Sequence, residues 1–123
     1  MREDIISACY HMIVDYLMNE NDDCARANAE IENGNAQSFA EDYLNENRDL
    51  IEDVCGEYTE EIEVFLILAD ALDEYGYDKS DYHECMISAL HRQQVLAVAV
   101  WDDVLQKFIK YLEEEFEDDY REE

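Results

Sequence analysis

Apolar residues recur at three- and four-residue steps along almost the whole chain, which is the spacing of one face of an α-helix. The first stretch predicts an amphipathic helix over about residues 3–19. The polar run at 19–23 predicts a loop that ends in a helix cap. A short helix of small residues should follow to about Glu32 and end at Asn33-Gly34, because glycine readily takes the backbone angles of a helix C-terminus.

The pattern resumes at Ala36 and predicts a third helical stretch that stops at Gly56, with residues 45–47 as its candidate break. The chain has no proline, so glycine and asparagine are the main signals that end a helix.

A fourth helix is predicted between Thr59, which can cap it, and Gly76. Its middle is apolar on every side, which predicts that it is the central core element. A short buried strand at 64–68 is the alternative, because brief apolar runs are ambiguous. Acidic residues on both sides and the continuing pattern through Leu72 favour the helix.

After the capping residues Asp78-Lys79-Ser80, nothing interrupts the apolar stripe to the end of the chain. A single helix over about 80–120 would be about 60 Å long at 1.5 Å per residue, longer than a compact domain of this size. We therefore predict an all-α, elongated single domain over 1–123, with four to five helices and one long C-terminal helix.

The net charge changes this picture most. The chain has 34 Asp and Glu but only 8 Lys and Arg, which gives a net charge of −26. Such an excess repels nucleic acid and anionic membranes and attracts proteins with basic clefts. Disorder is not expected, since 48% of the residues are hydrophobic and can form a core. The predicted partner is a positively charged protein.

The lack of recognisable targeting signals predicts a soluble protein of the cytoplasm. Residues 1–4 lack the basic and apolar segments of a secretory signal. The longest apolar run, Val95 to Trp101, is too short for the roughly 20 residues that span a bilayer. The four cysteines form no CxxC pair and are predicted to be reduced and mostly buried: Cys9, Cys24, Cys55 and Cys85.

Catalytic and metal-binding motifs are missing from the sequence. The three histidines, His11, His83 and His91, fit neither HExxH nor the Glu-x-x-His spacing of di-metal bundles. The three glycines stand too far apart for a phosphate loop, and no EF-hand loop can be built. We expect no enzyme activity, no cofactor and no metal site.

The acidic residues gather in two stretches. Between Glu41 and Asp78 there are fourteen acids and one basic residue, and Glu113 to Glu123 holds eight acids and one arginine. A charge of −26 equals the phosphates of about 13 base pairs, or about 44 Å of duplex, and a dimer would double both figures. Carboxylates along a helical rod can therefore match DNA in sign, spacing and length. The predicted phosphate-mimicking, partner-binding carboxylates are Glu41, Asp42, Glu46, Asp49, Glu52, Asp53, Glu57, Glu60, Glu61, Glu63, Asp102, Asp103, Glu113, Glu114, Glu117 and Asp118.

The last quarter of the chain carries three short motifs: Trp101-Asp102-Asp103, Tyr111-Leu112-Glu113-Glu114 and an acidic end at Glu122-Glu123. In these motifs and in their distances from the C-terminus, it resembles the phage Ocr (overcome-restriction) family of DNA-mimic anti-restriction proteins. A weaker likeness covers Cys9-Tyr10-His11-Met12 and the following Asp22-Asp23. Lys107 and Lys110 depart from it, placing positive charge where such a mimic would carry none.

The resemblance implies a homodimeric, mostly helical, banana-shaped mimic of bent B-form DNA. Such a protein occupies the DNA channel of type I restriction-modification enzymes in the host cytoplasm, binds no nucleic acid itself and helps a phage evade host defence. The alternative hypothesis is an acidic immunity-type, antitoxin-type or anti-CRISPR inhibitor that recognises one basic partner protein. A mimic should be long, whereas an immunity-type protein should be compact with one local acidic patch.

Overall fold

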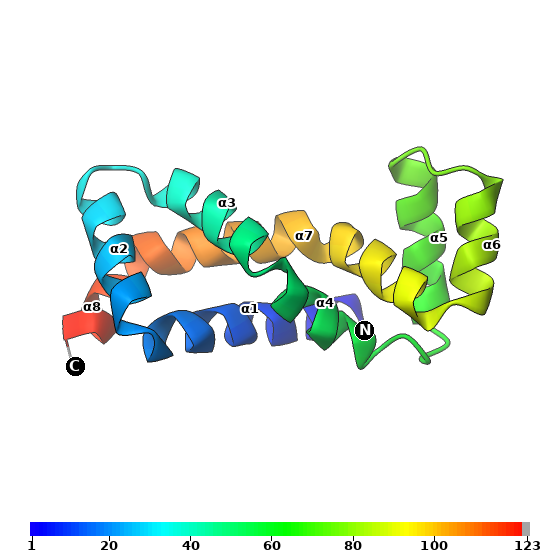
Figure 1. Cartoon of the computed structure of the whole chain (residues 1–123), viewed down its shortest axis with the longest axis horizontal. Coiled ribbons are helices and arrows are strands. Elements are labelled where there is room, and N and C mark those ends of the chain that lie inside the picture. The colour runs from blue at the N-terminus through cyan, green and yellow to red at the C-terminus, as the bar shows by residue number, and fades with distance from the viewer. Residues whose placement is uncertain (122–123) are drawn as a thin grey trace.

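The computed structural model describes residues 1–121, and within them it is all-helical, with eight helices and no strand (Figure 1). The fold class predicted from the sequence is confirmed, with more helices than expected. The helices are α1 (Arg2–Asn19), α2 (Asn21–Glu32), α3 (Ala36–Glu46), α4 (Arg48–Gly56), α5 (Val64–Glu74), α6 (Lys79–Ile87), α7 (Ala89–Glu114) and α8 (Phe116–Arg121).

The molecule is elongated, with α1 and α7 running along its long axis (Figure 1). Helices α3 and α4 return over them, while α2 and α8 lie at one end. At the other end, α5 and α6 pack together across the axis. We call α5, α6 and the first two turns of α7 the end lobe, and we call α1–α4, α8 and the rest of α7 the body.

Helix α7 is the central element, because it contacts each of the other seven helices in the described chain. Its side chains Leu96, Val100, Val104 and Phe108 are fully buried. The Phe108 ring stacks on Tyr43 of α3 with centroids 5.9 Å apart. Burial of this stripe against the other helices of the body supplies much of its hydrophobic stabilisation.

The prediction that the fourth segment is the core was wrong. The segment is helical, as expected, but α5 lies at one end and buries only one face, including Val64 and Leu68. Leu66 is 71% exposed, and Ile62, just before the helix, is 85% exposed. An all-round apolar pattern normally marks a helix with neighbours on every side, and within this chain α5 has neighbours on one side only.

Several helix boundaries follow their sequence signals. Gly34 and Gly76 take the left-handed backbone (φ of 77° and 71°) just after α2 and α5, where a residue with a Cβ would be strained. Asn47 separates α3 from α4 inside the candidate break. Asp78 caps α6 through a reciprocal capping box with Asp81.

Two boundaries in the first half of the chain differ from the predictions. Glu20 alone separates α1 from α2, so the loop at 19–23 is shorter than expected. Thr59 caps no helix, because turns fill the chain before α5 and its hydroxyl donates to the carbonyl of Gly56 (3.1 Å).

The single helix over 80–120 is broken twice in the described chain. At Ser88 the backbone becomes extended, and the Ser88 hydroxyl accepts the His91 N–H (3.2 Å), so it caps a new helix. The second break is at Glu115. The long C-terminal helix exists, but its 26 residues span about 39 Å rather than about 60 Å.

All four cysteines are buried and none forms a disulfide, as predicted. The hydrogen bond with Cys9, and then burial, hold the pKa of the Cys55 thiol above its ordinary value.

None of the helices in residues 1–121 is long and apolar enough to cross a bilayer.

Candidate acidic binding surface

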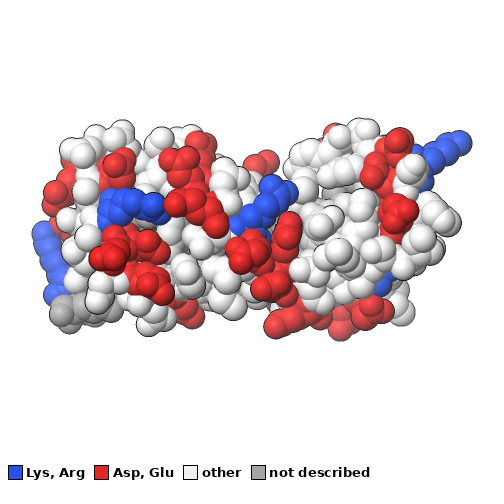
Figure 2. Space-filling model, viewed as in Figure 1, with Lys and Arg blue, Asp and Glu red and all other residues white. Residues whose placement is uncertain are grey.

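The carboxylates are on the surface along the whole length of the molecule (Figure 2). No Asp or Glu in residues 1–121 is buried, and the half-buried ones are Asp23, Glu30, Glu52 and Asp81. Of the sixteen carboxylates predicted from the sequence, all but Glu52 are exposed. Apart from Arg92, the buried positions of the same helices are taken by apolar residues, so the helical period separates core from charge.

The predicted carboxylates come from three parts of the fold. One group follows α3, α4 and the connection to α5, the second is Asp102 and Asp103 on α7, and the third lies at the end of α7 and on α8. The acidic end at Glu122-Glu123 lies outside the described residues. On the face in Figure 2, acidic side chains are spread over several helices and are separated by uncharged surface. They form no single local patch on this face.

The sequence did not predict that the arginines would hold some of these carboxylates. Each of the five arginines forms an ion pair, and five predicted carboxylates are therefore partly neutralised. The pairs are Arg2 with Asp103, Arg26 with Glu46, Arg48 with Glu52, Arg92 with Glu60 and Arg121 with Glu117. Arginine is suited to this role because its planar fork matches a carboxylate.

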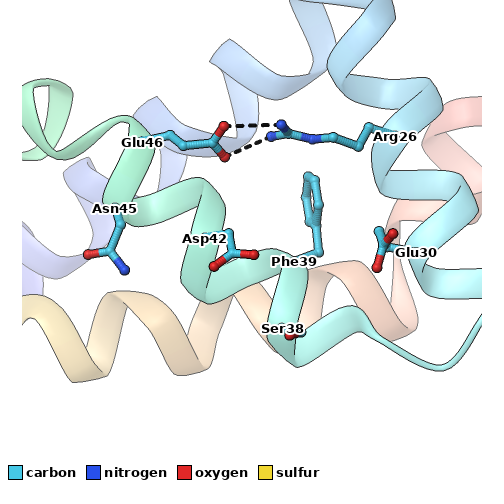
Figure 3. Close-up of a pocket in the computed structure, with 7 residues that line it drawn as sticks. All are labelled: Arg26, Glu30, Ser38, Phe39, Asp42, Asn45 and Glu46. Carbon is cyan, nitrogen blue, oxygen red and sulfur yellow. Dashed lines mark hydrogen bonds and ion pairs between the residues drawn. The ribbon is translucent and has the colours of Figure 1, made fainter.

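A pocket of about 450 Å³ between α2 and α3 brings carboxylates together around an aromatic ring (Figure 3). The Arg26 guanidinium lies 5.2 Å from the centre of the Phe39 ring and forms two hydrogen bonds to Glu46, of 3.1 and 2.9 Å. Glu30 of α2 and Asp42 of α3 line the same pocket. The hydrogen bond to Glu46 raises the pKa of Arg26 above the ordinary value of an arginine. The sequence analysis selected Asp42 and Glu46 but missed Glu30. Glu30 lies on α2, and counting charges along the chain does not show that α2 packs beside the carboxylates of α3.

Two tyrosines tie acidic residues to the core of the body. The Tyr43 hydroxyl donates to Asp23 (2.9 Å), and the Tyr111 hydroxyl donates to Asp119 (2.8 Å). Burial, together with these hydrogen bonds, raises the pKa of both phenols well above 10. Asp23 and Asp119 were not among the predicted carboxylates, and their role is to hold buried hydroxyls.

A second acidic group surrounds Asp102 and Asp103 at the contact of α5 with α7. Arg2 donates to Asp103 (2.7 Å) and to the carbonyl of Ala99 (2.8 Å). Burial, then the charge of Asp102 and that of Glu74, raises the pKa of Tyr75. Asp70 and Glu74 line the adjoining pocket of about 220 Å³. Their spacing on α5 alone gave no sign that they would lie beside the α7 carboxylates.

Lys107 and Lys110 lie beside the acidic end of α7. Both line a pocket of about 460 Å³ with Tyr10, Glu114 and Glu115, and the Lys107 ammonium is 5.8 Å from the centre of the Tyr10 ring. These two charges therefore interrupt the acidic surface at a place where the sequence predicted partner-binding carboxylates.

The arrangement presents carboxylates on helices to solvent and can bind cationic side chains. Within residues 1–121, no three His, Cys, Asp or Glu side chains gather in a way that could hold a metal ion. Comparisons of the chain with protein-family models, curated proteins and solved structures gave no match. The likeness to the Ocr family therefore stays a prediction from the residues quoted above.

Proposed function

We propose that this protein is a DNA mimic that binds the positively charged DNA-binding cleft of a host defence enzyme and competitively blocks DNA binding. A type I restriction-modification enzyme is the first candidate target, as the sequence resemblance implies. The observation that carries the proposal is that exposed carboxylates are distributed along an elongated helical molecule (Figures 1 and 2).

The physical basis is the way DNA-binding proteins hold DNA. Much of their affinity comes from Lys and Arg that neutralise phosphates without reading sequence. Carboxylates on helices can meet the same side chains, including arginines that bind two oxygens at once. Inhibition then needs no chemistry in the protein, only occupancy of the cleft.

The electric field of the whole molecule should make association with a basic cleft fast and dependent on salt. A charge of −26 steers a basic cleft toward the surface, and salt screens this attraction over about 10 Å at 0.1 M. Each exposed ion pair contributes only about 0–1 kcal/mol, so affinity must come from many pairs together. Arginine-paired carboxylates such as Glu46 are available only if the partner displaces the internal arginine.

The proposal includes a homodimer and a phage-encoded protein in the host cytoplasm, both as the Ocr resemblance implies. A dimer would present charge equivalent to about 26 base pairs, twice that of one protomer.

The second candidate is an acidic inhibitor of one basic partner, of the immunity, antitoxin or anti-CRISPR type. The pocket between α2 and α3 favours it, because a defined pocket with Glu30, Asp42 and an aromatic ring suits one anchoring Arg or Lys. Elongation favours the mimic.

The test is a panel of DNA-binding enzymes that includes a type I restriction enzyme and a CRISPR effector. DNA binding is measured with and without the protein at low and moderate salt. We expect the type I enzyme to lose DNA, with an inhibitory effect that weakens as salt rises. If no enzyme loses DNA and the protein captures a partner that never binds nucleic acid, the mimic proposal is wrong.

A further inference from the structure

Residues 113–121, which we call the acidic C-terminal segment, include helix α8 and pack against the end of α7. The segment carries six carboxylates and one arginine, and like charges at this density repel one another and favour an extended chain. Helix α8 has only six residues, whereas an isolated helix in water needs about 12–15 to be even marginally stable. Contacts with the rest of the molecule must therefore hold α8 in place.

Aromatic packing fixes the start of α8. Phe116, its first residue, is completely buried. Its ring lies edge-on to Tyr111 of α7, with centroids 6.3 Å apart, and stacks on Tyr120 at 5.4 Å. Because apolar burial has little directional preference, the orientation of the carboxylates on α8 needs hydrogen bonds as well.

Two phenols supply the directional contacts. The buried Tyr111 hydroxyl donates to Asp119 of α8 (2.8 Å). Tyr10 of α1 lies edge-on to the Tyr111 ring at 6.3 Å. Burial, then the charges of Glu115 and Asp119 and a hydrogen bond with Glu115, raise the pKa of Tyr10. The break after α7 and the middle of α8 are thus each held by a carboxylate that faces a phenol of another helix. We call these four residues the tyrosine clamp.

Lys107 and Lys110 lie beside this clamp and have a use within the chain itself. Both line one pocket with Tyr10, Glu114 and Glu115. Unlike the five arginines, neither lysine forms an ion pair with any residue in 1–121. Lys107 instead lies over the Tyr10 ring. Two uncancelled positive charges at this position lower the repulsion within the acidic C-terminal segment.

We propose that Tyr10 and Tyr111 are positioning residues which, supported by the two lysines, hold the acidic C-terminal segment as a fixed part of the surface that meets a basic partner. Glu115 and Asp119 serve the clamp. The segment's other exposed carboxylates without an ion pair in residues 1–121 then face the partner, and these are Glu113, Glu114 and Asp118. The claim about the partner rests on the proposed function, whereas the claim that the clamp orders the segment does not.

The binding consequence is specific to dissociation. Net charge sets how fast a basic cleft is attracted, so a change that keeps the charge of −26 should leave the association rate unchanged. A segment that is already ordered loses less conformational freedom in the complex than a mobile one. Loosening the clamp should therefore speed dissociation without slowing association.

The first measurement is the backbone order parameter of residues 116–121 in the intact protein, from ¹⁵N NMR relaxation. We expect about 0.8 for wild type and below about 0.6 for the double variant Tyr10→Phe, Tyr111→Phe, which keeps both rings and the net charge. Tyr43→Phe is the matched control, because it removes a similar hydrogen bond, to Asp23 (2.9 Å), elsewhere in the body. It should leave residues 116–121 ordered. Circular dichroism and the unfolding midpoint report whether each variant is folded.

The second measurement is the rate of dissociation from an immobilised type I restriction enzyme, by surface plasmon resonance. The double variant should dissociate about 5- to 10-fold faster, with an association rate within about twofold of wild type. Lys107→Gln makes the protein more negative, so charge alone predicts tighter binding, whereas the clamp predicts dissociation at least about twofold faster. Lys79→Gln on α6 changes the net charge equally and should not speed dissociation.

The outcomes separate the clamp from the proposed function. Residues 116–121 that are mobile in wild type, or as ordered in the double variant as in wild type, would overturn the proposal. A segment that loosens with no change in the dissociation rate would overturn its role in the contact. Lys107→Gln that dissociates no faster than Lys79→Gln would overturn the role of the lysine. A segment that loosens only in the double variant, in a protein that binds no DNA-binding enzyme, would support the clamp and refute the DNA-mimic function.

Discussion

The body and the end lobe use the same kind of sequence in opposite ways. In the body, the apolar stripe of α7 is covered by α1, α3 and α4, and Phe108 is completely buried. In the end lobe, α5 is still more apolar in sequence but is covered on one face only, and Leu66 remains 71% exposed. The difference lies in the number of neighbouring helices and not in the residues themselves. An apolar run with too few neighbours in its own chain therefore points to a neighbour from outside it.

The largest effect is expected in the core of the body. Phe108→Ala should lower the free energy of unfolding by about 3–5 kcal/mol, because it leaves a cavity beside the stacked Tyr43 ring. Leu66→Ala, measured by urea unfolding at a concentration where the protein is monomeric, should change it by no more than about 0.5 kcal/mol. Equal losses from the two substitutions would mean that the lobe is packed as tightly as the body.

The next largest effect is expected at Arg92, which ties the end lobe to the turns that precede α5. Its guanidinium holds the carbonyls of Thr59 and Cys85, so Arg92→Met should leave buried acceptors unpaired and cost about 2–3 kcal/mol. Hydrogen exchange should then accelerate in α5 and α6 before it does in α1. Arg48→Met, which removes an exposed arginine, is the matched control and should cost under about 1 kcal/mol. Uniform acceleration across all helices would contradict a distinct lobe.

Alkaline pH should destabilise the body through its buried tyrosines. The phenols of Tyr43 and Tyr111 have raised pKa values in the folded state, so above about pH 10 the unfolded chain releases protons that the folded chain retains. Their stabilising contribution is thus fully present below pH 10 and is lost as pH rises beyond it.

The check is the free energy of unfolding measured from pH 7 to 11 for wild type and for Tyr43→Phe with Tyr111→Phe. The double variant should fall less steeply above pH 10, by up to about 1.4 kcal/mol per pH unit for each phenol removed. The control is Tyr82→Phe, an exposed tyrosine of the end lobe, which should keep the wild-type slope. Identical slopes for all three proteins would refute this assignment.

The smallest effect, on partner affinity, is expected at Arg26, which lines the acidic pocket between α2 and α3. Arg26→Gln frees Glu46 and adds one negative charge to the surface, so a basic partner should bind up to about fivefold more tightly. Arg121→Gln frees Glu117 on α8 and changes the net charge equally. The affinity of each variant for one DNA-binding enzyme is measured by titration calorimetry. A larger gain in affinity for Arg26→Gln than for Arg121→Gln would show that the pocket takes part in the contact with the enzyme. Equal gains would assign the effect to overall charge.

The helical fold could be predicted because apolar spacing, glycines and capping residues are local signals. Gly34, Asn47 and Asp78 ended or began helices where the sequence indicated. The break at Ser88 was missed, because the apolar stripe continues through it and the capping serine is a single residue. The position of α5 was predicted wrongly, since periodicity reports which faces are apolar and not whether other helices cover them.

The acidic surface was predictable in its exposure but not in its pairing. None of the predicted carboxylates is buried and all but Glu52 are exposed, because charged positions fall opposite the apolar face of each helix. Pairs such as Arg2 with Asp103 join residues about a hundred positions apart, so they depend on how α1 packs on α7. Glu30 and Asp70 join acidic groups for the same reason.

The most direct measurement of the central claim is an equilibrium competition between this protein and a fluorescent DNA duplex for a type I restriction enzyme. It compares wild type with a body variant (Glu41→Gln, Asp42→Asn, Asp49→Asn and Asp53→Asn), with salt varied from 0.05 to 0.2 M. The account predicts that wild type displaces DNA completely, less strongly as salt rises, and that the body variant is about 10- to 100-fold weaker. DNA that stays bound at saturating protein, or a body variant as potent as wild type, would contradict it.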